Sequence, residues 1–189
     1  MAIEMVIASK NPDKAKEIAA VMAEVGLIPI WGQDWPDVQE TGVDLEANAL
    51  LKAEAVMAAT GLPTLADDTG LEVAAIGGAP GVRTARFAGP DATYDDNVSL
   101  LLERMAGIDD RRATFRTVVA AVFPGGRRVL AEGALEGTIA LVRRGSGGFG
   151  YDPVFEVEGS TLAELGVAVK NTLSHRARAV RALAAKLSE

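Results

Sequence analysis

The stretch Met5-Val6-Ile7-Ala8-Ser9-Lys10-Asn11-Pro12 decides the fold class of this chain. Its four apolar residues have the length of a short buried strand, and a polar turn follows them. Asn11-Pro12 then predicts the start of a helix, because asparagine is a favoured N-cap and proline suits the first helical position. A strand that passes directly into a helix begins the strand–helix alternation that, with the later hairpins, indicates an α/β protein.

Outward from this stretch, strands and helices alternate before the pattern changes to hairpins. The helix is expected to end at Gly26, and residues 27–31 are expected to form the second strand. Further helices are predicted over residues 44–60, 94–105 and 174–187, and further strands over residues 64–66, 114–123, 127–135, 139–142 and 154–157. Pro124-Gly125-Gly126 predicts the turn of a hairpin. We therefore expect a single α/β domain, residues 1–189, with a mixed central sheet and flanking helices.

The composition excludes several classes of protein. The 189 residues include no cysteine, which rules out disulfides, thiolate metal sites and cysteine nucleophiles. A net charge of −7 would repel the backbone of a nucleic acid, so no nucleic-acid partner is expected. Glu4 stands where a signal peptide needs positive charge, and no apolar run approaches the roughly 20 residues of a membrane span. We expect a cytoplasmic protein without a membrane partner, for which a small phosphorylated ligand remains possible.

The segment Ser9-Lys10-Asn11-Pro12-Asp13-Lys14 is a first candidate site, for an anion. A helix N-terminus offers unbonded backbone N–H groups and the positive end of the helix dipole. Lys14 lies in the first turn, where a cation is electrostatically unfavourable unless an anion binds beside it. The alternative is that Lys14 pairs with Glu17 or is only solvated. No G-x-x-x-x-G-K-[ST] stretch occurs, so the segment is not a P-loop.

Four acidic residues, Glu40, Asp67, Asp68 and Glu72, form a second candidate site, for a metal ion. Asp67 and Asp68 are expected where the strand over residues 64–66 ends, a place where ligand sites of α/β sheets commonly lie. Neighbouring strand residues point to opposite faces, so at most one of the two should project into a given cleft unless the chain turns. Carboxylates, phosphate oxygens and water are the usual ligands of Mg²⁺. The alternative is a plain Asp-Asp-Thr-Gly turn.

The glycine-rich stretch over residues 145–153 is a third candidate site and contains a literal G-x-G-x-x-G. The dinucleotide-binding fingerprint requires a helix next, whereas Pro153 and the apolar pair Val154-Phe155 follow here, so Rossmann-type binding is rejected. Phe149 is flanked by glycines and could stack on a nucleobase. The alternative is a flexible hairpin loop with a partly buried phenylalanine.

The stretch Lys170-Asn171-Thr172-Leu173-Ser174-His175-Arg176 is the fourth candidate and holds the only histidine of the chain. His175 stands among polar residues at a predicted helix start, which indicates a polar setting rather than a core setting. One histidine cannot build a histidine-based zinc site, and no Ser-His-Asp triad is suggested. The alternative is a structural histidine.

Taken together and in this order, these segments closely resemble the inosine triphosphate pyrophosphatase family, also called the dITP/XTP pyrophosphatases. The matching stretches span nearly the whole chain and are Ser9-to-Lys14, Glu40-Thr41-Gly42, Ala66-to-Leu71, Gly77-to-Gly81, Ala85-to-Gly89, Gly147-to-Pro153, and Lys170 with Ser174-His175-Arg176. The resemblance implies two lobes on a mixed sheet around an active-site cleft, and a homodimer. It also implies Mg²⁺-dependent hydrolysis of deaminated purine nucleoside triphosphates between the α- and β-phosphates.

The resemblance further implies the site residues. Glu40 and Asp68 match the metal-binding carboxylates, and Asp68 also matches the proposed proton acceptor. The residues matched to substrate binding are Ser9, Lys10, Asn11, Pro12, Asp13, Lys14, Thr69, Phe149, Gly150, Tyr151, Asp152, Lys170, His175 and Arg176. Many relatives carry glycine in place of Lys10, and Thr69 replaces a serine but keeps the hydroxyl. No role follows for Asp67 or Glu72.

Two other functions remain open: a pyrophosphatase for pyrimidine or modified triphosphates, and a non-catalytic nucleotide sensor. The acidic group favours an enzyme, because a pure triphosphate binder gains nothing from extra carboxylates without a metal. We expect ITP, dITP and XTP to be hydrolysed faster than ATP and GTP. His175 and Arg176, or backbone amides nearby, could donate to the O6 of hypoxanthine, where adenine carries an amino group. Asp152 would accept from N1–H or orient Arg176.

Overall fold

Eight strands form one mixed sheet in the computed structural model, which describes residues 3–32 and 34–188. The strand order is β2-β1-β3-β5-β6-β7-β8, and β4 pairs with β3 outside this path. β1 is parallel to β2 and β3, β4 is antiparallel to β3, and β7 is antiparallel to β6 and β8. The strands are β1 (Glu4–Ile7), β2 (Ile28–Ile30), β3 (Thr64–Val73), β4 (Pro80–Gly81), β5 (Arg112–Val122), β6 (Arg128–Ile139), β7 (Phe155–Val157) and β8 (Ser160–Thr161).

The helices alternate with the strands in the first part of the chain and close it at the end. They are α1 (Pro12–Glu24), α2 (Leu45–Thr60), α3 (Tyr94–Arg104), α4 (Gly166–Leu173) and α5 (His175–Leu187), with two short 3₁₀ helices, η1 (Ala74–Ile76) and η2 (Thr84–Arg86). The chain divides into two compact units, each described by itself below. Unit 1 comprises residues 1–69, 117–134 and 174–189, and unit 2 comprises residues 70–116 and 135–173.

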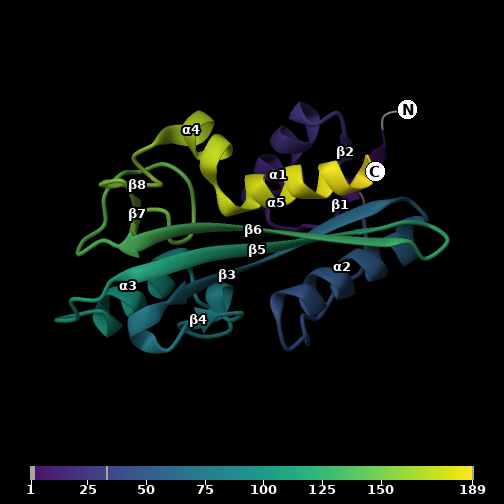
Figure 1. Ribbon diagram of the computed structural model, residues 1–189. Helices are drawn as coiled ribbons and strands as arrows, with labels where there is room; N and C mark the ends of the chain where they lie inside the picture. Colours follow the sequence, from purple (N-terminus) through teal and green to yellow (C-terminus); the bar gives the residue numbers. More distant parts are fainter. Residues whose placement is uncertain (1–2, 33, 189) are drawn as a thin grey trace. The chain divides into compact units, whose positions relative to one another are not determined.

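Unit 1 has three layers, a helix pair, a sheet and a single helix. Met5 and Ile7 of β1 and Leu65 of β3 belong to a buried cluster that α1 and α5 complete. Val6 of β1 and Ala66 of β3 belong to a second cluster that α2 completes, because successive strand residues point to opposite faces. Figure 1 shows α1 and α5 together on one side of β1 and α2 on the other side.

The first and last helices of unit 1 begin at side-chain caps. The Asn11 side chain accepts hydrogen bonds from the backbone N–H groups of Asp13 (3.0 Å) and Lys14 (3.3 Å), and Pro12 occupies the first helical position. The Ser174 side chain accepts from a backbone N–H in the first turn of α5. Each cap satisfies donors that the helix itself leaves without partners, which explains why both helices begin where they do.

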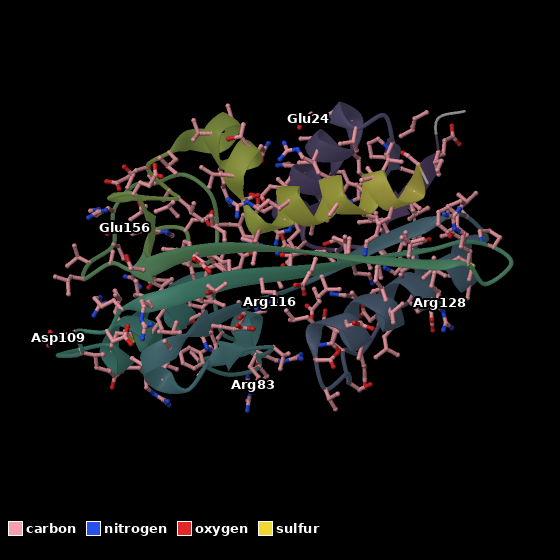
Figure 2. The ribbon with its side chains drawn as sticks, viewed as in Figure 1. Glu24, Arg83, Asp109, Arg116, Arg128 and Glu156 are labelled. Atoms are coloured by element: carbon pink, nitrogen blue, oxygen red, sulfur yellow. The ribbon has the colours of Figure 1, made fainter. Side chains whose placement is uncertain are left out.

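The first turn of helix α5 packs directly against strand β6 at Gly133. A Cβ atom at Gly133 would overlap the carbonyl oxygen of His175 and lie 2.5 Å from the amide nitrogen of Ala179. Only glycine therefore allows this close approach of helix and strand. Further along the helix, Arg181 forms an ion pair of 2.7 Å with Glu24 of α1, which Figure 2 labels.

Unit 2 has its own apolar core. Leu71 and Val73 of β3 pack with α3, with β5 and β6, and with the segment around β7. The rings of Phe115 and Phe155 lie 4.6 Å apart between centroids. Arg111 donates from its guanidinium to the carbonyl oxygens of four residues, Met105, Ile108, Ile139 and Ala140, and so ties the end of α3 to the end of β6.

The structure confirms the α/β class, the mixed sheet with flanking helices, and the hairpin, whose strands β5 and β6 are joined through residues 123–127. Two expectations were wrong. Strand β3 continues to Val73 instead of ending at residue 66, and β6 ends at Ile139, so that residues 140–142 do not extend it. Helix α4 and the short strands β4 and β8 were not predicted. Aspartate is unfavourable in strands and β-branched residues are unfavourable in helices, so local propensity predicted neither the full length of β3 nor the helix α4.

Candidate active site

Asp67 and Asp68 lie in the middle of β3 and point to opposite faces of the sheet in unit 1. Asp67 lies on the same face of the strand as Leu65 and contacts side chains of α1 and α5. Asp68 lies on the same face as Ala66 and contacts side chains of α2. The expectation that the pair would diverge is therefore confirmed, and the alternative of a plain turn is wrong, because the strand continues through both residues. Each carboxylate organises its own cluster.

The Asp67 cluster is a buried network of charges. The Oδ2 atom of Asp67, which is 1% exposed, lies 3.2 Å from Arg176 Nε and 3.5 Å from Lys14 Nζ. Arg176, 2% exposed, also forms an ion pair with Glu17 and donates from Nη2 to Thr69 Oγ1 at 3.2 Å. Lys14 therefore pairs with Asp67, and Glu17, its expected alternative partner, pairs with Arg176.

Opposite charges keep Asp67 and Arg176 ionised in spite of their burial. Burial alone would raise the pKa of Asp67, but the positive charges of Lys14, Arg176 and Lys52 hold that pKa well below its ordinary value. Burial would likewise lower the pKa of Arg176, and the two carboxylates beside it raise that pKa instead. The cluster thus holds the side chains of Lys14 and Arg176 beside one buried carboxylate.

A chain of hydroxyl groups links this network to the only histidine. Thr69 Oγ1 lies 2.7 Å from Thr117 Oγ1, which in turn lies 2.6 Å from Nδ1 of His175. His175 is 3% exposed, so its setting is buried, although its hydrogen-bond partner is polar. The expected polar setting is confirmed by the bond to Thr117, but the side chain is also buried, because Gly133 allows the first turn of α5 to pack closely against the sheet.

The Asp68 cluster gathers two carboxylates around one ammonium group. Lys52 Nζ lies 2.7 Å from Glu40 Oε1 and 3.5 Å from Asp68 Oδ1. The other carboxylate oxygen of Asp68 accepts a hydrogen bond from Asn48 Nδ2 at 3.0 Å. Burial is the main cause that raises the pKa of Asp68, assisted by the negative charge of Glu40. Burial lowers the pKa of Lys52, but the carboxylates around it reverse the direction and raise it.

The donor set of this cluster fits a divalent cation such as Mg²⁺. Glu40 and Asp68 already direct oxygens at one cation, the ammonium group of Lys52. Within the described part of the chain no three acidic or histidine side chains are grouped as metal ligands. Mg²⁺ is typically held by one or two carboxylates together with substrate phosphates and water, so two carboxylates suffice only when a phosphorylated ligand completes the shell.

Helix α1 supplies Lys14 and Glu17 to the Asp67 cluster, but its first turn offers fewer unbonded backbone N–H groups than expected. Asn11 already occupies the N–H groups of Asp13 and Lys14, and its own N–H donates to Ser9 Oγ at 3.3 Å. Lys10 forms an exposed ion pair with Asp37. Phosphate binding here would therefore depend on the side chains more than on the helix backbone.

The predicted base-binding residues of unit 2 form a third cluster. Asp152 Oδ2 accepts from the backbone N–H of Phe149 at 2.8 Å and from Lys170 Nζ at 2.5 Å, and both charged side chains are 4% exposed. Lys170 Nζ lies 4.5 Å from the centre of the Phe149 ring, a cation–π contact. The ring of Tyr94 lies 5.9 Å from the same ring. Asp152 thus orients Lys170 and Phe149, whereas Arg176 is oriented by Asp67.

The remaining predicted residues of this loop have structural settings. Gly148 adopts φ +70°, and a Cβ atom there would overlap the carboxylate of Asp152. Gly150 adopts φ +62°. The Tyr151 hydroxyl donates to the carbonyl oxygen of Thr84 at 3.0 Å, and burial raises the pKa of this phenol. Substrate contacts of Gly150 and Tyr151 stay predictions.

Sequence reasoning missed several residues of these clusters. Lys52 and Asn48 lie on the buried side of α2, where a charged or amide group among alanines and leucines is a signal that it has a specific partner. Glu17 and Thr117 gave no such signal. Glu72, which was left without a role, lies in unit 2 and forms a partly exposed ion pair of 3.4 Å with Arg116.

Among residues 3–32 and 34–188, no helix combines the length and apolar character that crossing a membrane requires.

Comparisons with known proteins find relatives that match nearly the whole chain. A model of the Ham1 family matches residues 5–186. The chain is 47% identical to a dITP/XTP pyrophosphatase of Aromatoleum aromaticum, over 100% of this chain and 98% of that protein, and 49% identical to one of Porphyromonas gingivalis, over 95% of each. Among solved structures, a HAM1 protein from Coxiella burnetii shares 38% identity with a TM-score of 0.88, and the Staphylococcus aureus Ham1 protein shares 37% with a TM-score of 0.86. Both structural matches cover 98% of each chain.

Proposed function

The chain belongs to the Ham1 family, and from this premise we propose that it is a nucleoside triphosphate pyrophosphatase for deaminated purine nucleotides. In the proposed reaction ITP, dITP or XTP is hydrolysed between the α- and β-phosphates, and the products are the monophosphate and pyrophosphate. The reaction would depend on Mg²⁺. The name dITP/XTP pyrophosphatase, carried by relatives that match nearly the whole chain, supports the substrate class.

One observation carries the catalytic part of the proposal, the convergence of Glu40 and Asp68 on Lys52. A mostly enclosed ammonium flanked by two carboxylates would be a complete structural ion cluster if no ligand bound there. The Asp67 cluster lies on the other face of the same strand, but its cation Lys14 is close enough to act on the pKa of Asp68, so positive charge that suits an anionic ligand is near the two carboxylates. A metal–triphosphate complex has both signs of charge and matches this pairing of acidic and basic groups.

The residues of unit 1 would divide the work of hydrolysis. Glu40 and Asp68 would hold Mg²⁺, which when bound would offset phosphate charge and polarise the anhydride. Lys14 and Lys52 would add positive charge to the phosphate oxygens. As the anhydride breaks, a water molecule supplies the new oxygen and Asp68 accepts the proton of that water.

Recognition of the base would use donors directed at O6. Nδ1 of His175 is engaged with Thr117, so a bond from this ring to the base would come from Nε2. Arg176 is held by two carboxylates and is therefore fixed in direction. Adenine would place an amino group against such donors, and a site built on hydrogen bonds can reject the wrong group by roughly 10⁴-fold or more. Within unit 2, Lys170 and Asp152 orient Phe149, and the family resemblance assigns this ring to substrate binding.

The test is release of pyrophosphate from ITP, XTP, GTP, ATP and TTP in the presence of Mg²⁺, with the nucleotide products identified. We expect pyrophosphate and monophosphate from ITP and XTP, with much lower kcat/KM for ATP and TTP. GTP shares O6 with ITP, so its expected lower kcat/KM depends on a region at C2 that offers its 2-amino group no acceptor. Comparable kcat/KM values for ITP and ATP would exclude recognition by donors to O6. Faster hydrolysis of TTP would indicate a pyrimidine enzyme, and nucleotide binding without any pyrophosphate would indicate a sensor.

A further inference from the structure

Asn48, on the buried side of α2, connects the two carboxylates of the proposed cation site. Its side chain is fully enclosed, with the residue 1% exposed. Nδ2 donates to Asp68 Oδ2 at 3.0 Å, and Oδ1 accepts from the backbone N–H of Gly42 at 2.8 Å. A carboxylate can only accept and a backbone N–H can only donate, so just one orientation of the amide satisfies both partners. Asn48 is therefore fixed in direction by its neighbours.

Each of these bonds acts on one of the two carboxylates. With Oδ2 of Asp68 taken by Asn48, it is Oδ1 that faces Lys52. Gly42 follows Glu40 by two residues in a segment without regular secondary structure, and the bond to Asn48 ties that segment to α2. The contact is tight, because a Cβ atom at Gly42 would lie 2.6 Å from Asn48 Oδ1. One amide thus sets where both carboxylates lie.

We propose that Asn48 is a positioning residue that holds Glu40 and Asp68 at the separation a divalent cation requires. The inference rests on the proposed function only in so far as Glu40 and Asp68 bind the cation. Mg²⁺ demands near-ideal octahedral geometry, so a small displacement of either ligand weakens binding. Removing hydrogen-bond partners of metal ligands typically lowers metal affinity about 10- to 100-fold.

Unit 2 offers a matched control in Asn97 of α3. This residue is 2% exposed, accepts from the N–H of Ala88 at 2.8 Å and donates to the carbonyl oxygen of Ala85 at 3.1 Å. Like Asn48, it is a helical asparagine that ties a loop to its helix, but neither of these bonds involves a carboxylate. Asn48→Ala and Asn97→Ala should therefore both lower the melting temperature, and only Asn48→Ala should change cation binding.

The experiment measures binding of Mn²⁺ by electron paramagnetic resonance, with Mn²⁺ alone and with inorganic tripolyphosphate, well below the melting temperature of each variant. We expect the Kd for Mn²⁺ to rise about 10- to 100-fold in Asn48→Ala and to stay unchanged in Asn97→Ala. Gly42→Ala displaces the same amide from the loop side and should also weaken Mn²⁺ binding, which keeps the test available if Asn48→Ala does not fold. An unchanged Kd in the folded Asn48→Ala protein, or in Gly42→Ala if Asn48→Ala does not fold, would overturn the inference.

The two proposals fail in different ways in this experiment. A wild-type protein that binds Mn²⁺ but releases no pyrophosphate from ITP would refute the proposed function and leave the role of Asn48 standing on the titration. A wild-type protein that binds no Mn²⁺ in either condition would refute the cation site, and the inference with it.

Discussion

Asp67 and Asp68 are adjacent in the chain but have different partners and different pKa directions. Asp67 is surrounded by cations that lower its pKa, whereas burial and Glu40 raise that of Asp68. The physical cause is the alternation of side chains along β3, which directs one carboxylate to α1 and α5 and the other to α2. At the scale of single residues, Asp67 is therefore a support for Arg176 and Lys14, and Asp68 is the candidate for chemistry.

Replacing Asp68 by asparagine should remove turnover without unfolding the protein. The amide keeps the shape and one acceptor oxygen, but it cannot accept a proton or bind a cation with a full charge. We expect kcat for ITP to fall by at least ~10²-fold, with little change in melting temperature. Glu72→Gln, on the same strand in a partly exposed ion pair, is the control and should keep its activity. A normal kcat in Asp68→Asn would remove this residue from the catalytic step.

Lys14→Ala should weaken triphosphate binding more than it harms folding. Its ammonium is 3.5 Å from Asp67 and its side chain is 21% exposed, so it can reach a ligand while part of the Asp67 cluster. The rise in melting temperature caused by ITP and Mg²⁺ should shrink in this variant, because that rise reports ligand affinity. Lys16→Ala, exposed on the same helix, should show the wild-type rise. An undiminished rise in Lys14→Ala would contradict a phosphate role.

At the scale of secondary-structure elements, the contact of α5 with β6 determines where the side chains of His175 and Arg176 lie. Gly133→Ala would insert a methyl group where the backbone of α5 now lies. We expect a loss of about 1–3 kcal/mol in stability, together with a higher KM for ITP because both side chains would shift. Urea unfolding and steady-state kinetics measure the two effects. Glu132→Ala, at the neighbouring exposed position of β6, is the control, and equal behaviour of the two variants would contradict the argument.

The end of α3 in unit 2 depends on Arg111. Its guanidinium donates to four carbonyl oxygens, and Arg111→Met would leave those acceptors without their donor. We expect a loss of about 2 kcal/mol or more in the free energy of unfolding. The neighbouring Arg112 forms an exposed ion pair with Asp110, so Arg112→Met should cost much less. Denaturant titrations that give both variants the same stability would contradict this role.

At the scale of the whole molecule, a homodimer is expected from the family resemblance alone. Sedimentation equilibrium should give twice the 19.7 kDa mass of the chain, with and without nucleotide. A single species of 19.7 kDa at micromolar concentration would count against the dimer.

The sequence by itself determined the local features of this protein. The Asn11-Pro12 and Ser174 helix starts, the hairpin turn over residues 124–126 and the divergence of Asp67 and Asp68 all depend on neighbours within a few residues. Such neighbours are visible in the chain, because capping, turn preference and strand alternation are short-range effects. The α/β class followed from these signals in combination.

Only the tertiary structure decided which side chains share a cluster. Arg176 meets Asp67 across more than one hundred residues of chain, and Lys52 meets Glu40 and Asp68 from a helix in which the sequence predicted no partner for it. The same packing allows β3 to continue through Asp67 and Asp68, because the cations of the packed helices offset the free-energy cost of burying a carboxylate in the strand. Local propensity cannot register these partners, since they become neighbours only when helices α1, α2 and α5 pack on the sheet.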